Sequence, residues 1–172
     1  MQRVKAIVIV PPRTLPTERF EASVDVMPVR TGWVRGALLA IALGLLGVFS
    51  IAAWLNPYDE EGNARRLETH LQIGLPPCTF RSLTGIPCPS CGMTTSFALL
   101  MHGDLANSLR ANAVGTLLAL FGLAVLPWSL ASAVFGRPLL VRSPERAVLG
   151  IVIVFVVLLL TRWLVILTLG SY

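Results

Sequence analysis

The sequence predicts an all-α integral membrane protein. Of its 172 residues, 55% are hydrophobic and only 13% are charged, and the mean hydropathy is +0.74. Soluble domains carry roughly 25% charged residues, so this chain has too few charges to cover a water-facing surface. Three separate apolar stretches also reach the length of about 20 residues that a helix needs to cross a bilayer. This composition excludes a disordered chain, a collagen and a typical soluble enzyme.

The three predicted spans are Gly36–Leu55, Ala113–Phe135 and Ala147–Leu169. Each is apolar on every face, and lipid cannot hydrogen-bond a bare backbone, so we expect each span to be a helix. Pro127 lies inside the second span, where it either introduces a mild kink or is simply tolerated. Arg162 is the one charged residue inside a span.

The basic residues predict the orientation of these spans. They are concentrated before the first span and in the short connection between the second and third, and they are sparse near the spans in the long connection 56–112. The positive-inside rule therefore places residues 1–32, which we expect to form a flexible tail, in the cytoplasm. Within the membrane domain 33–172, the connection 56–112 and the C-terminus are expected outside. The net charge of +5 then reflects topology and attraction to the lipid bilayer rather than nucleic-acid binding.

Two short helices are expected in the outer connection. Apolar spacing predicts one over Asn63–Ile73, and a second follows Gly92 through about His102. The second is too short to span a bilayer, so we expect an interfacial or re-entrant helix. Asp104 can cap a further helix that continues into the second span.

All three cysteines lie within fourteen residues of this connection. Cys88 and Cys91 form a CxxC motif in the turn CPSCG, and Cys78 lies ten residues upstream. A structural role is one interpretation, in which two cysteines form a disulfide or all three are packing residues. An odd count then leaves a free thiol or a bridge to another chain.

Metal binding is the second interpretation. Two thiolates three residues apart can bind one zinc or iron ion, and the following glycine lets the chain turn tightly around it. Cys78 would supply a third thiolate. A closed site needs a fourth ligand, which His102 or His70 would have to provide.

Thiol–disulfide exchange is the third interpretation. A CxxC pair at a helix start has its thiolate stabilised by the helix dipole and by free backbone N–H groups. Cys88 and Cys91 would then be catalytic, with Cys78 as a resolving thiol.

The segment around these cysteines resembles the family of small bacterial membrane proteins grouped as domain of unknown function 2752. The similarity covers roughly residues 76–125. Ala113 stands where that family often has proline, and Thr95 stands where many members carry an arginine, so a positive charge beside the cysteines is missing here. The matching residues are Cys78, Thr84, Gly85, Pro87, Cys88, Pro89, Cys91, Gly92, Thr94, Gly103, Asp104 and Asn112. The resemblance implies a bacterial inner-membrane location and no established activity.

Arg162 could replace the missing charge. It either reaches the outer headgroups, or it faces the helix bundle and lies near Asp104 or the cysteine turn. Together these observations predict a non-enzymatic membrane protein whose CPSCG turn is structural or binds a metal ion or a membrane-protein partner. A membrane thiol–disulfide oxidoreductase is the alternative.

Overall fold

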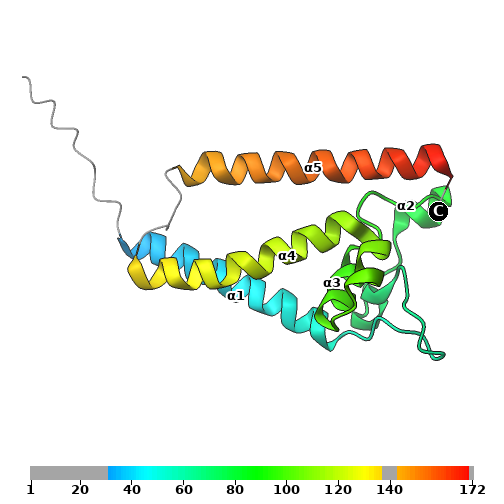
Figure 1. Ribbon diagram of the computed structural model, residues 1–172, viewed down its shortest axis with the longest axis horizontal. Helices are drawn as coiled ribbons and strands as arrows, with labels where there is room; N and C mark the ends of the chain where they lie inside the picture. Colours follow the sequence, from blue (N-terminus) through cyan, green and yellow to red (C-terminus); the bar gives the residue numbers. More distant parts are fainter. Residues whose placement is uncertain (1–30, 137–142, 171–172) are drawn as a thin grey trace, which may run out of the picture.

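The computed structural model describes residues 31–136 and 143–170, and this part of the chain is mostly helical (Figure 1). All but the last two residues of the predicted tail 1–32 lie outside the described residues. Thr31 and Gly32 instead begin the first helix. The elements in chain order are α1 (Thr31–Trp54), the 3-10 helix η1 (Thr69–Ile73), α2 (Thr79–Thr84), α3 (Met93–Met101), α4 (Leu105–Phe135) and α5 (Pro144–Leu169).

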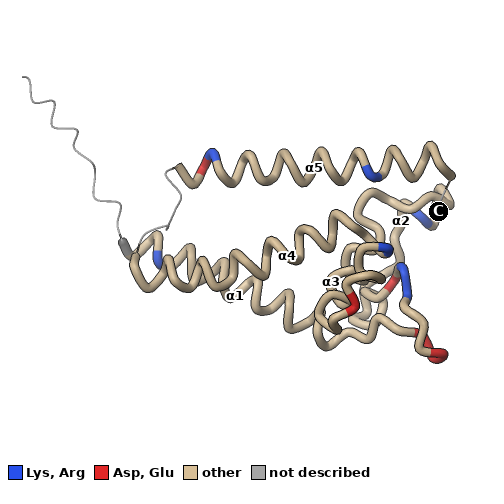
Figure 2. The backbone as a smooth tube through the Cα atoms, viewed as in Figure 1, with Lys and Arg blue, Asp and Glu red and all other residues tan. Residues whose placement is uncertain are grey.

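Three of these helices, α1, α4 and α5, are long and apolar enough to cross a membrane. The predicted fold class is therefore confirmed, and the chain is a multi-pass membrane protein whose apolar helices contact lipid. Figure 2 shows the charged residues mainly near the ends of the long helices and in the connection between α1 and α3, with one basic position well inside α5. The sequence identifies that position as Arg162.

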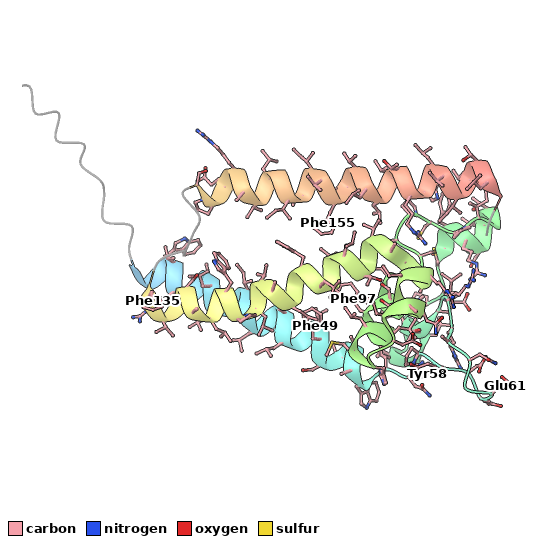
Figure 3. All side chains as sticks on the ribbon, viewed as in Figure 1. Phe49, Tyr58, Glu61, Phe97, Phe135 and Phe155 are labelled. Carbon is pink, nitrogen blue, oxygen red and sulfur yellow. The ribbon has the colours of Figure 1, made fainter. Side chains whose placement is uncertain are left out.

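The core lies between α1, α3 and α4. Phe49 of α1 stacks on Phe97 of α3 with ring centroids 5.9 Å apart (Figure 3). A Cβ at Gly122 of α4 would lie 3.1 Å from the Phe49 ring, so the glycine allows α1 and α4 to pack closely. At the other end of α1, Arg35 donates hydrogen bonds to the carbonyls of Ala133 and Val134, which lie in the last turn of α4.

Helix α5 is the least packed of the three long helices. None of its residues is buried. It meets α4 where Phe121 and Phe155 approach with centroids 5.9 Å apart. Its C-terminal end lies beside α2, where Trp163 makes an edge contact with Phe80 (Figure 1).

Helix α4 is two helical segments joined at Asn112. This residue has extended backbone angles, φ −157° and ψ 101°, inside an otherwise continuous helix. The second segment begins at Ala113, which is where the second predicted span begins. The break was not predicted, and it falls at Asn112 rather than at Pro127, the proline considered as a kink.

Buried polar groups hold α3 against both segments of α4. The Ser108 hydroxyl donates to the Ser96 carbonyl at 2.7 Å and lies 2.7 Å from the Thr116 hydroxyl. Gly115 lets the helices approach closely, because a Cβ there would meet the Ser96 hydroxyl. Within the described residues no buried side-chain polar atom lacks a partner.

The connection 56–112 is only partly as predicted. The prediction of a helix over Asn63–Ile73 is wrong in length, because only Thr69–Ile73 is helical, as a short 3-10 helix. The segment before it folds back as a small loop, in which the Asp59 carboxylate accepts from the Asn63 amide at 2.7 Å and Tyr58 pairs with Ala64. Helix α2 was not predicted.

The helix expected after Gly92 is confirmed as α3. Asp104 caps α4 as predicted, since its side chain accepts from the backbone N–H of Asn107. Whether α3 is interfacial or re-entrant stays a prediction.

Candidate metal centre

Three free thiols meet between α2 and α3. The sulfur atoms of Cys78, Cys88 and Cys91 all lie within 4.8 Å of one another, and those of Cys88 and Cys91 are 3.1 Å apart. All three side chains are half-buried. Cys78 precedes α2 and the other two precede α3, so the cluster joins two separate segments of the connection 56–112.

The CPSCG turn is shaped by its own hydrogen bonds. The Cys91 amide donates to the Cys88 carbonyl at 3.0 Å, which closes a tight turn. In the opposite direction, the Cys88 amide donates to the Cys91 sulfur at 3.2 Å. A backbone N–H aimed at a sulfur stabilises its thiolate form, which is the form that binds metals.

Gly92 ends this turn at a position with no room for a side chain. Its φ is +83°, in the left-handed region that favours glycine. A Cβ would also lie 2.8 Å from the carbonyl oxygen of Ala111 and 3.0 Å from that of Arg66. The turn is therefore packed directly against the backbone of α4 and of the loop before η1.

Asn112 links the turn to the break in α4. Its side chain is fully buried, and its amide nitrogen donates to the Cys91 carbonyl at 3.1 Å. Its side-chain oxygen accepts from the Gly115 amide at 3.0 Å, so Asn112 caps the second segment of α4. This capping role of Asn112 was not predicted, although an asparagine just before an apolar run is a helix-start signal.

Arg162 donates a hydrogen bond to the backbone carbonyl that this break leaves without its helical partner. In a continuous helix the Gly115 amide would donate to the Ala111 carbonyl, but here it donates to Asn112. The Arg162 guanidinium donates to Ala111 instead, at 3.1 Å. It is also close enough to Cys91 for an electrostatic interaction. Arg162 thus faces the bundle beside the cysteine turn.

Asp104 was the other partner considered for Arg162, and the structure does not pair them. The Asp104 carboxylate accepts instead from the Asn107 side chain at 2.7 Å. The neighbour of Arg162, Trp163, donates its indole N–H to the Pro87 carbonyl at 2.8 Å. Of these two adjacent residues of α5, Trp163 therefore contacts the residue before Cys88, and Arg162 contacts the α4 backbone on which the turn packs.

The two cysteines of the turn differ in acidity. Burial by itself raises the pKa of Cys88, but hydrogen bonds from Ser90, Cys91 and Cys78 outweigh it, so the pKa of Cys88 is lowered. Burial has the largest effect on Cys91, and the hydrogen bonds of its side chain with Cys88 and Cys78 act in the same direction. Together they raise the pKa of Cys91 to about 12. In the absence of a metal, Cys88 is therefore the first of these two cysteines to form a thiolate.

The structure does not bring His102 to the sulfurs. Its Nδ1 lies 2.9 Å from the Ala98 carbonyl, and its ring contacts Tyr58. His102 follows α3 and Cys91 precedes it, which separates them by roughly 15 Å at about 1.5 Å per helical residue. His70, the other candidate, lines a cavity of about 270 Å³ together with all three cysteines.

Residues 78–126 match the family model described as Protein of unknown function (DUF2752). No curated protein and no solved structure matches the chain. The matched segment contains the three cysteines, Gly92 and Asn112, whereas Arg162 and His70 lie outside it. Over the segment that forms this site, the chain is thus similar to the DUF2752 family, as its motif predicted.

Proposed function

We propose that Cys78, Cys88 and Cys91 form a metal centre, with zinc as the favoured ion, on the extracytoplasmic side of a bacterial inner-membrane protein. The observation that supports this proposal is the convergence of three free sulfurs from two segments within 4.8 Å. Ligands of a tetrahedral zinc ion at Zn–S distances of about 2.3 Å are about 3.8 Å apart. Small side-chain movements would therefore bring all three sulfurs onto one ion.

His70 is the proposed fourth ligand. It shares a cavity with the sulfurs, whereas His102 lies at the far end of α3. A closed set of four protein ligands is typical of structural zinc sites. Such an ion would fasten η1 and the start of α2 to α3, and would need no substrate. The proposed role is accordingly non-enzymatic.

Metal binding would release protons from this cluster. All three cysteines bind as thiolates, including Cys91, whose pKa is raised to about 12. The apparent affinity should therefore fall as the pH is lowered. This dependence separates the thiolate site from adventitious binding at carboxylates, which remain ionised at neutral pH.

A thiol–disulfide oxidoreductase is the second candidate. It is favoured by the lowered pKa of Cys88 and the 3.1 Å separation between its sulfur and that of Cys91. The Cys88 thiolate would attack a substrate disulfide and break its S–S bond, forming a mixed disulfide with one substrate sulfur and releasing the other as a thiolate. Cys91, after losing its proton, would then displace the substrate thiol. The protein would gain the Cys88–Cys91 disulfide while the substrate is reduced by two electrons.

Metal analysis of the purified full chain separates the two candidates. We expect about one zinc per chain, lost in Cys88→Ser and retained in Ser90→Ala, which changes the same turn without removing a sulfur. His70→Ala should weaken zinc binding, and the matched variant His102→Ala should leave it unchanged. A metal-free protein that carries a Cys88–Cys91 disulfide when isolated without reductant would overturn the metal proposal and support the redox one.

A further inference from the structure

A second polar cavity lies on the other side of the outer connection. Its volume is about 430 Å³, and it shares no lining residue with the cysteine cavity. The loop after α1 and the first segment of α4 both contribute to it. The residues on which the argument depends are Tyr58, Arg65, Arg66, Asp104, Asn107 and Arg110.

Positive charge exceeds negative charge in this cavity. Three arginines line it against the single carboxylate of Asp104. The acidic run 59–61 does not line it, and Glu61 lies at the tip of the loop, farther from α4 than Tyr58 (Figure 3). Asp104 is already engaged with Asn107 and, at 3.5 Å, with the Tyr58 hydroxyl.

The guanidinium groups retain free donors. Arg65 donates through Nε to the Tyr58 carbonyl, and Arg110 donates to the Asn107 side-chain oxygen at 3.2 Å. Each leaves other N–H groups unused. Arg66 makes no side-chain hydrogen bond within residues 31–136 and 143–170. The salt bridge seen in that part of the chain joins Arg81 to Glu68, outside this cavity.

We propose that this cavity binds the phosphate group of an anionic ligand. A planar guanidinium fork matches phosphate oxygens in a bidentate way, and a net excess of two positive charges suits a phosphate of one or two negative charges. The volume lies in the range of cavities that hold small ligands. Because Tyr58 follows α1 closely and Arg110 precedes the break in α4, the cavity lies where two spans end.

That position allows two sources of the same chemistry, a phospholipid headgroup and a soluble phosphate compound. The full chain would be placed in nanodiscs of phosphatidylcholine, with or without phosphatidylglycerol, and the retained lipid measured by native mass spectrometry. Separately, glycerol phosphate would be titrated against the detergent-solubilised chain and followed by thermal shift. Retention of phosphatidylglycerol alone identifies a headgroup site, and a response to glycerol phosphate identifies a soluble ligand.

Single arginine substitutions test which side chains of the cavity bind the phosphate group. Arg66→Gln and Arg110→Gln should each weaken the observed binding roughly tenfold or more, the effect of losing one charged hydrogen bond. Arg66→Gln breaks no hydrogen bond seen in the described residues, so it should fold normally. Arg81→Gln, which removes an equal charge from outside the cavity, should bind as the unmodified chain does. No binding in either arm, or an equal loss in Arg81→Gln, would overturn the proposal.

Discussion

Replacing Gly92 with alanine adds a methyl group where two backbone segments meet. At φ +83° an L-residue is destabilised by about 1–2 kcal/mol. The new Cβ would also lie 2.8 Å and 3.0 Å from the carbonyl oxygens of Ala111 and Arg66. Neither oxygen can rotate away, and overpacking of this kind costs typically about 1–3 kcal/mol. We therefore expect Gly92→Ala to lower the free energy of unfolding by about 2–5 kcal/mol.

Gly103→Ala is the matched control for this substitution. Gly103 has φ +81°, but a Cβ there would meet no atom within 4 Å. The free energy of unfolding of Gly103→Ala should therefore fall only by the backbone contribution, about 1–2 kcal/mol. Thermal unfolding in detergent, followed by tryptophan fluorescence, should place Gly92→Ala below Gly103→Ala by on the order of 5 °C. Equal losses in the two variants would show that the turn does not pack on Ala111 and Arg66.

Three further predictions concern the same region. In the metal-free, reduced protein, iodoacetamide should modify Cys88 at lower pH than Cys91, because a lowered pKa supplies thiolate at lower pH and a raised pKa delays it. Mass spectrometry across a pH series measures both rates, and coincident profiles would contradict the assignment. Arg162→Leu should shift the profile of Cys91 to higher pH because it removes a nearby positive charge; an unchanged profile would limit Arg162 to its carbonyl contact. Asn112→Ala should destabilise the protein by about 1–3 kcal/mol through loss of a cap and a buried hydrogen bond, whereas Ala113→Pro should be tolerated at the first position of a helix. Circular-dichroism melts compare these two variants, and equal damage would mean that the helix does not restart at Asn112.

The membrane spans were predictable because their signal is long and local. About 20 apolar residues in a row have few alternatives to a transmembrane helix. Each predicted span ends within one residue of its helix, although α1, α4 and α5 begin five, eight and three residues earlier than the predicted spans. The connection 56–112 was harder to predict. Helix α2 has six residues and no apolar period, and the loop before η1 depends on the Asp59 side chain bonding the backbone of Asn63. Such contacts are set by single groups rather than by a repeating pattern.

The sequence predicted which cysteines form the candidate site, but it did not predict the residues that surround them. Clustering in the sequence was enough to place Cys78, Cys88 and Cys91 together. Of the two histidines offered as a fourth ligand, His102 conflicts with the predicted helix itself, since that helix separates His102 from Cys91 by its whole length. The role of Arg162 depends on a carbonyl freed fifty-one residues earlier in the chain, and no local pattern encodes such a contact.

The contact between Arg162 and Ala111 has a consequence for how the protein is assembled in the bilayer. An arginine within an apolar helix opposes membrane insertion by about 2.5–3.5 kcal/mol on translocon scales. The group that accepts its hydrogen bond belongs to α4, which is synthesised before α5. The Ala111 carbonyl is free to accept from the arginine because the helix is broken at Asn112. The order of synthesis thus supplies the acceptor first and the charge afterwards.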